Sequence, residues 1–202
     1  MTFQINHQRF FIRPLLALLT VFSVMACSNQ NIKFNNVDIT GSKAFGKDFS
    51  LIDHNGKKRE LADFKGQLVV MFYGFTQCPD VCPTTMTEMQ GVMELLGKDA
   101  NRVQVMFVTV DPERDTQELL AQYVPAFDRR FLGLRPQSTE ELGKITKDFK
   151  VFYKKVPGNS PTSYTIDHTA GSYVFDTKGQ LRLFLKHHQG PQPIAEDLKK
   201  LL

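Results

Sequence analysis

The run Leu68-Val69-Val70-Met71-Phe72-Tyr73 constrains the fold more than any other stretch of this chain. The run is apolar without alternation, which predicts a strand that is covered on both faces. Such strands belong to sheets with helices on either side. The run leads into Cys78-Pro79-Asp80-Val81-Cys82-Pro83, at the carboxyl end of the strand, where α/β folds place their sites. We therefore expect an α/β domain whose site lies at the cysteines.

From Phe45 onward, strand-type and helix-type patterns alternate. His54-Asn55-Gly56 is a hairpin turn signal between two short strands. We expect strands over 49–53, 57–61, 68–73, 103–110, 164–166, 172–175 and 181–186. We expect helices from Pro79 to about Leu96, over 116–123, from Ser138 onward and over 194–202. This order predicts a thioredoxin-like α/β fold with an N-terminal β-hairpin extension.

The first 27 residues are typical of an export signal. Arg9 and Arg13 precede an apolar run from Pro14 to Met25, which is shorter than the roughly 20 residues of a membrane span. The run ends in Val24-Met25-Ala26-Cys27, which resembles a bacterial lipobox with Cys27 lipidated. We expect a lipoprotein signal peptide over 1–26, a flexible tether over 27–44 and the domain over 45–202. An ordinary signal peptide cut nearby would instead leave Cys27 as a spare thiol.

The mature chain is then expected on the periplasmic side, anchored by its lipid, with the inner or outer membrane left open. Disulfides persist outside the cytoplasm, so a cysteine pair can be redox-active there. Without Arg9 and Arg13, 23 basic residues face 21 acidic ones, and no basic stripe with interleaved aromatic residues appears. This near balance gives nucleic-acid binding no support.

Cys78 and Cys82 are four residues apart at the expected start of a helix. Their side chains are then on one face, about 5–6 Å apart between Cβ atoms. The pair can close into a disulfide or bind one ion together. A helix N-terminus favours the thiolate form that binds metal. A plain structural disulfide is the alternative.

Three motifs resemble the signatures of the Sco/SenC family and occur in the family's order. They are Phe75-Thr76-Gln77-Cys78-Pro79-Asp80-Val81-Cys82-Pro83, Thr109-Val110-Asp111-Pro112-Glu113-Arg114-Asp115-Thr116 and Asp167-His168-Thr169. The resemblance covers roughly residues 45 to 200. It implies a thioredoxin-fold copper protein that helps to assemble the copper A centre of cytochrome c oxidase. Carried over by position, the ligands of one copper ion per chain are Cys78, Cys82 and His168.

Two thiolates and an imidazole form a soft ligand set that suits Cu(I), and binding of Cu(II) stays open. His187-His188 near a strand end is an alternative metal-binding pair. Adjacent strand residues point to opposite faces, which makes the pair a poor chelate. Three methionines at helical spacing are expected to pack in the core rather than bind copper: Met86, Met89 and Met93.

The segment from Asp111 to Thr116 follows the second buried strand, at the same edge of the expected sheet. Its simplest interpretation is a loop in which Asp115 or Thr116 caps the next helix and Arg114 forms a surface ion pair. The alternative is support of the copper site. Asp111, and Asp167 beside the histidine, are the candidates for orienting a ligand or a partner.

These patterns predict a membrane-anchored, extracytoplasmic copper chaperone, more a metallochaperone than an enzyme. Its expected partners are the copper A subunit of cytochrome c oxidase or another copper enzyme, other copper carriers, and thiol reductants. The alternative is a thiol–disulfide oxidoreductase that keeps the recipient's copper-site cysteines reduced. The three-residue spacing of the cysteines and the lack of proline between Thr162 and Gly190 count against an ordinary thioredoxin. A peroxiredoxin-like peroxidase would not need His168.

Overall fold

The computed structural model describes residues 1–2, 32–160 and 163–202, so the expected signal peptide and Cys27 lie outside the described residues, apart from Met1 and Thr2. Ile32–Leu202 form one unit, and Met1 and Thr2 belong to another. Within the described residues, no helix is both long enough and apolar enough to cross a membrane.

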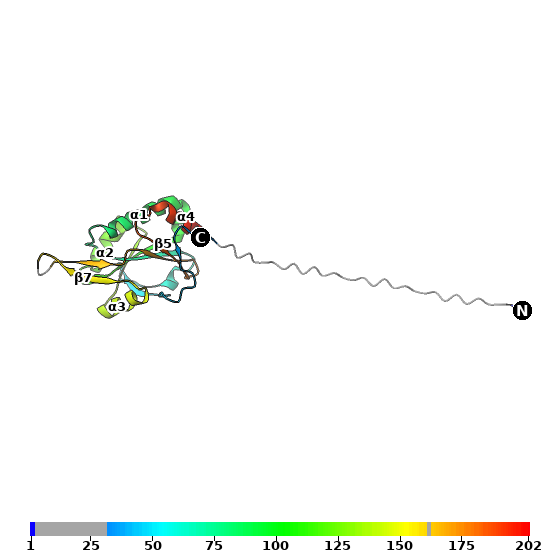
Figure 1. Cartoon of the computed structure of the whole chain (residues 1–202), viewed down its shortest axis with the longest axis horizontal. Coiled ribbons are helices and arrows are strands. Elements are labelled where there is room, and N and C mark those ends of the chain that lie inside the picture. Colours follow the sequence, from blue (N-terminus) through cyan, green and yellow to red (C-terminus); the bar gives the residue numbers. More distant parts are fainter. Residues whose placement is uncertain (3–31, 161–162) are drawn as a thin grey trace. The chain divides into compact units, whose positions relative to one another are not determined.

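An eight-stranded sheet forms the centre of the domain, in the order β1-β10-β9-β4-β5-β6-β2-β3 (Figure 1). Its strands are β1 (Val37–Asp38), β2 (Ser50–Asp53), β3 (Lys58–Glu60), β4 (Leu68–Gly74), β5 (Val103–Thr109), β6 (Leu132–Arg135), β9 (Ser172–Phe175) and β10 (Leu181–Leu185). β4, β5 and β6 run parallel, and all other neighbours run antiparallel. A separate antiparallel hairpin consists of β7 (Tyr153–Pro157) and β8 (Tyr164–His168).

Helices cover both faces of the sheet, as the apolar run predicted. α1 (Val81–Leu96) and α4 (Pro191–Leu201) lie on one side and α3 (Thr139–Asp148) on the other, while the short α2 (Gln117–Tyr123) follows β5 (Figure 1). All residues of β4 are buried, and alternate side chains enter two cores. Val70 packs in the core with α1 and α4, and Val69 packs in the core with α3. The thioredoxin-like α/β fold is therefore confirmed, with the β2–β3 hairpin as its N-terminal extension.

The methionines of α1 belong to the core. Met86, Met89 and Met93 are at most 2% exposed and pack against the sheet and α4. Helical spacing puts them on one buried face, as predicted. They are therefore packing residues, and their thioether sulfurs are withdrawn from the surface.

Several elements differ from the sequence-based expectation. β1, β6 and β7 were not predicted, because β1 is very short, a glycine interrupts β6, and β7 carries exposed lysines. α1 begins at Val81 after Asp80 at the N-cap, so Pro79 precedes the helix instead of lying in its first turn. Pro83 occupies the first turn instead, where a missing N–H costs little.

The expected tether over 27–44 differs from the structure in its second half. Val37 in β1 pairs with Phe184 of β10, so this segment is part of the sheet. The unexposed carboxylate of Asp197 in α4 accepts hydrogen bonds from the backbone N–H groups of Asn35 at 2.9 Å and Asn36 at 2.8 Å. Asn35 and Asn36 thus satisfy a buried charge. The folded unit extends at least to Ile32 and does not begin at residue 45.

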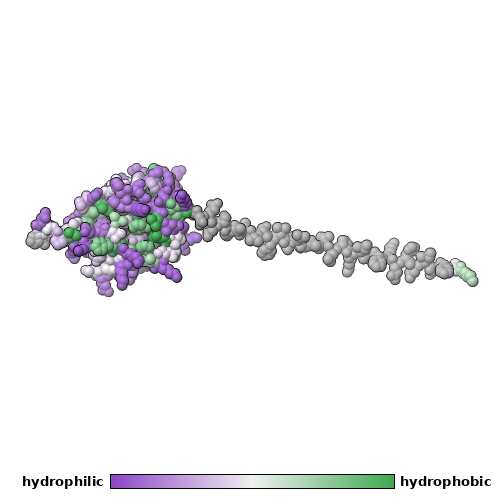
Figure 2. All heavy atoms as spheres, in the orientation of Figure 1, coloured by the Kyte–Doolittle hydropathy of each residue, from purple (hydrophilic) through white to green (hydrophobic). Residues whose placement is uncertain are grey.

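The surface of the domain is mixed in polarity. On the face shown in Figure 2, hydrophobic residues gather in a band between hydrophilic regions. The band lies at the level of the sheet in Figure 1, between the α1–α4 layer and α3. On this face, the regions above and below the band are mostly hydrophilic, which agrees with two helical layers that bury their inner faces (Figure 2).

Replacement of Asp197 tests how firmly the N-terminal segment is attached. Asp197→Ala leaves buried N–H groups without an acceptor, and we expect a loss of about 1–3 kcal/mol in the free energy of unfolding, measured with urea. Burial opposes ionisation of Asp197, but the hydrogen bonds from Asn35 and Asn36 lower its pKa. The stabilisation is therefore present at neutral pH and lost as the pH falls through that lowered pKa. Lys199→Ala on the exposed side of α4 is the control and leaves the urea midpoint unchanged.

Candidate metal centre

The two cysteines lie at the junction of β4 and α1, but their environments differ. Cys82 is in the first turn of α1 and is fully buried, whereas Cys78 is half-buried in the preceding loop. The backbone N–H of Cys82 donates to Cys78 Sγ at 3.4 Å. A Cβ atom added to Gly74, at the end of β4, would lie 2.6 Å from Cys82 Sγ. Only glycine therefore allows the sulfur to sit against the end of the strand.

His168 reaches the cysteines from the far end of the chain. It is the last residue of β8, and its Nε2 lies 3.6 Å from Cys82 Sγ. Its Nδ1 lies 3.1 Å from the carbonyl oxygen of Thr169, which can only accept a hydrogen bond. The proton is therefore on Nδ1, and Nε2 carries the lone pair. The ring of Phe75 packs edge-on against the imidazole, with 5.9 Å between the ring centres.

The two sulfurs and one imidazole nitrogen all lie within 4.8 Å of one another. Among the described residues, no other group of three His, Cys, Asp or Glu side chains meets in this way. A cavity of about 360 Å³ opens beside Cys78 and His168 and is lined in part by Asp80 and Ile166. Two thiols and one imidazole beside an open cavity can bind a soft metal ion together.

The cysteine thiols share a proton unequally. A hydrogen bond from Cys82, against the opposing effect of burial, lowers the pKa of Cys78 to about 3, and backbone N–H groups add to this. The same hydrogen bond and burial raise the pKa of Cys82. At neutral pH the reduced pair thus has one thiolate, on Cys78, and one thiol, on Cys82.

Asp115 positions the loop before Cys78. Its unexposed carboxylate accepts hydrogen bonds from Thr76 Oγ1 at 2.6 Å, from the Thr76 backbone N–H at 3.1 Å and from Thr109 Oγ1 at 2.6 Å. Burial raises the pKa of this carboxyl, although the hydrogen bonds lower it. Of the two expected caps of α2, Thr116 is the one observed, since its Oγ1 accepts from the Leu119 N–H at 3.2 Å.

Asp111 and Asp167, the two predicted supporting residues, lie in different surroundings. Asp111 is buried, accepts a hydrogen bond from the Tyr164 hydroxyl at 2.8 Å and pairs with Arg114. Asp111 therefore contacts the β7–β8 hairpin, which carries His168, through Tyr164. Asp167 is exposed and lines the cavity beside Cys78, and its carboxylate makes no hydrogen bond among the described residues. The Nδ1 of His168 is bonded to the Thr169 carbonyl, so Asp167 does not orient the imidazole through that atom.

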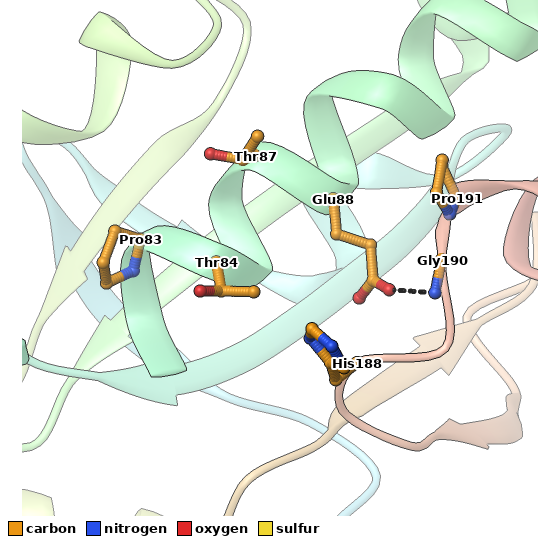
Figure 3. Close-up of a pocket in the computed structure, with 7 residues that line it drawn as sticks. All are labelled: Pro83, Thr84, Thr87, Glu88, His188, Gly190 and Pro191. Carbon is orange, nitrogen blue, oxygen red and sulfur yellow. Dashed lines mark hydrogen bonds between the residues drawn. The ribbon is translucent and has the colours of Figure 1, made fainter. Parts of the chain in front are cut away.

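His187 and His188 lie apart from this centre. The Thr85 hydroxyl donates to the Val81 carbonyl at 2.8 Å and so accepts from His187 Nδ1, 3.2 Å away. His188 is exposed and lines another cavity, of about 590 Å³, between α1 and the start of α4 (Figure 3). There Glu88 accepts a hydrogen bond from the Gly190 N–H at 2.6 Å, which holds the loop to α1. Both histidines follow β10, and their ring centres lie 5.7 Å apart, so the expectation that they point to opposite faces of a strand is wrong. Among the described residues, neither belongs to a group of three metal-ligating side chains.

The sequence-based interpretation missed the hairpin and the residues that attach it. The signal was present, because Pro157-Gly158-Asn159-Ser160 is a turn-forming stretch between two segments that contain tyrosine and valine or isoleucine. The contacts of Arg114 and Asp115 had no comparable signal. Both residues belong to a polar loop, and their burial depends on segments far away in the sequence.

Comparison with known proteins agrees with this geometry. The model of the SCO1/SenC family matches residues 37–202. The SCO2-like protein of Rickettsia felis is 37% identical over 189 residues, which are 92% of this chain and 87% of that protein. The mitochondrial SCO2 homolog of mouse is 37% identical over 155 residues, 76% of this chain and 60% of that protein. The structure of Bradyrhizobium japonicum ScoI with copper bound has a TM-score of 0.72 and 39% identity, and the match covers 79% of this chain and all of that one.

Alkylation of the reduced protein tests the difference between the two thiols. Because the lowered pKa of Cys78 keeps it ionised, we expect iodoacetamide to modify it about as fast at pH 5 as at pH 7, with Cys82 protected. Peptide mass spectrometry assigns the modified residue. In protein unfolded with guanidinium, the alkylation rates of Cys78 and Cys82 should both fall about tenfold per pH unit below the ordinary thiol pKa of roughly 8.5. Modification of Cys82 before Cys78 would contradict the assignment.

Proposed function

Because the chain belongs to the SCO1/SenC family, we propose that it binds one copper ion through Cys78, Cys82 and His168 and delivers it to a copper enzyme. The proposed recipient is the copper A subunit of cytochrome c oxidase or another copper enzyme. The observation that carries the proposal is the meeting of two sulfurs and one imidazole nitrogen within 4.8 Å. The copper-bound state of the Bradyrhizobium relative supports the identity of the metal.

The arrangement suits a carrier that must both hold and release its cargo. Cys78 offers a thiolate at the surface, and Cys82 offers a second sulfur once its proton is released. His168 supplies a neutral imidazole, which is the form that binds metal. Three soft ligands satisfy Cu(I), and the cavity beside Cys78 leaves an approach for a ligand of the recipient. Formation of a Cys78–Cys82 disulfide would remove both thiolates, which links copper binding to the redox state.

The same pair supports a second candidate function, thiol–disulfide exchange. A surface thiolate at Cys78 is suited to attack a disulfide of a partner. The buried Cys82 is then placed to resolve the mixed disulfide. In this role the protein would keep the cysteines of the recipient's copper site reduced, through contact with a thiol reductant. Both roles use Cys78 and Cys82. Copper binding also needs His168, whereas thiol–disulfide exchange does not.

The proposed location follows from the N-terminal sequence. Residues 1–26 act as a lipoprotein signal peptide, and Cys27 carries the lipid that anchors the protein on the periplasmic side of a membrane. The domain then follows a tether that is shorter than the predicted range of 27–44, because Val37 already belongs to the sheet. Other copper carriers are the proposed donors of the ion.

Copper titration of the reduced protein tests the ligand set. We expect one copper per chain, and His168→Ala should weaken binding by several orders of magnitude because one of three ligands is lost. His187→Ala and His188→Ala are matched controls and should bind as wild type, since these residues lie outside the centre. Metal analysis and competition with a Cu(I) chelator give stoichiometry and affinity. Loss of copper in the double control, with retention in His168→Ala, would refute the assignment.

A test in cells separates the two functions. His168→Ala damages the copper site and leaves the dithiol intact. If the protein is a chaperone, this variant should lose cytochrome c oxidase activity like the deletion strain, and added copper should partly restore it. If it is a reductase, the variant should keep full activity while Cys78→Ser is inactive. Oxidase activity in isolated membranes, with and without added copper, distinguishes these results.

A further inference from the structure

The two halves of the proposed copper site belong to separate parts of the fold. Cys78 and Cys82 lie at the end of the main sheet, whereas His168 lies on the β7–β8 hairpin. Within the described residues, the hairpin strands form a sheet of their own. The backbone ladder of the main sheet therefore does not place His168. Its position relative to the sulfurs depends on the packing of Ile166 in the core with α3 and on contacts between the hairpin and the neighbouring loops.

Arg114 makes the most direct of these contacts. Its Nη1 donates to the side chain of Gln77 at 3.0 Å and to the Tyr164 carbonyl oxygen at 2.9 Å. Its Nε pairs with the buried carboxylate of Asp111. Gln77 precedes Cys78, and Tyr164 begins β8. One guanidinium group thus connects the cysteine loop, the loop after β5 and the strand that ends at His168.

Ring contacts support the same connection. The guanidinium carbon of Arg114 lies 3.6 Å from the centre of the Tyr164 ring and 5.7 Å from that of Phe75. Phe75 in turn packs edge-on against the imidazole of His168. The Tyr164 hydroxyl donates to Asp111 at 2.8 Å, so Arg114, Asp111 and Tyr164 form a closed set of contacts. The planar fork of arginine suits several partners at once, and lysine cannot replace it there.

We propose that Arg114 is a positioning residue that, with Asp111 and Tyr164, fixes the β7–β8 hairpin so that His168 Nε2 faces the two sulfurs. The sequence suggested only a surface ion pair for Arg114, but its side chain is 20% exposed and lies between two rings. Its effect on copper rests on the proposed function. Its effect on the hairpin does not, because the contacts exist in the metal-free chain.

Amide hydrogen exchange in the reduced, metal-free protein is the first measurement. Arg114→Met should raise exchange over residues 164–168 about tenfold or more, because hydrogen bonds to charged groups contribute that much to an opening equilibrium. Arg114→Lys should behave in the same way, since one ammonium group cannot reach three partners. Lys155→Met is the matched control. Lys155 also contacts the Tyr164 ring, at 4.7 Å, but its ion pair with Glu113 is exposed, so exchange should stay as in wild type.

Copper binding is the second measurement. Arg114→Met and Arg114→Lys should lower copper affinity roughly 10- to 100-fold, the range expected for a residue that supports a metal ligand. Electron paramagnetic resonance of the Cu(II) form should show loss of the imidazole nitrogen coupling with retention of the sulfur ligands. Lys155→Met should keep both the affinity and the spectrum.

The outcomes are distinct. Wild-type exchange in Arg114→Met, or equal changes in Lys155→Met, would overturn the positioning role. If the wild-type chain binds no copper, the proposed function fails, and exchange alone still decides the role of Arg114. If Arg114→Met does not fold, as judged by circular dichroism, Tyr164→Phe replaces it. Loss of the hydroxyl bond to Asp111 must then raise exchange over 164–168, and unchanged exchange would refute the proposal.

Discussion

The parallel pairing of β4 with β5 is the constraint on which the candidate centre depends. It runs in register from Leu68 opposite Val103 to Gly74 opposite Thr109, so both strands leave the sheet at the same edge. The loops that follow are therefore neighbours, and the carboxylate of Asp115 in one receives the hydrogen bonds of Thr76 in the other. A carboxylate withdrawn from water would be costly without such partners. The loop that presents Cys78 is thus held by the sheet and not by a bond between the cysteines.

The asymmetry between the two sulfurs follows from this geometry. Because Gly74 has no side chain, Cys82 Sγ lies against the end of β4 and is removed from solvent. Cys78 stays in the loop, where backbone N–H groups and Cys82 stabilise its thiolate. Two chemically identical side chains therefore lie in different environments. Cys78 is partly accessible to solvent, and Cys82 is protected by the core.

The local parts of the site could be predicted from sequence, whereas the long-range parts could not. Strand β4, the cysteine turn and α1 are contiguous, so hydrophobic pattern and spacing were sufficient. His168 was assigned only through its resemblance to a family motif, because a short polar loop carries no sign of which distant segment it meets. Arg114 was expected in solvent, since nothing in a charged loop indicates that Tyr164, 50 residues later, covers it. The second half of the expected tether was wrong for a related reason, because the residue that binds Asn35 and Asn36 is Asp197 in the last helix.

Cys82 and His168 are separated by 86 residues in the sequence. This separation determines whether the site can form before the chain has folded. An unfolded or partly synthesised chain offers the two cysteines without a fixed imidazole, because closing so long a loop carries an entropic cost that only the folded sheet offsets. The three side chains therefore come together only after β8 has packed against the rest of the domain. For the copper site proposed above, folding then comes before binding, and a copy that has failed to fold cannot offer all three side chains to the ion.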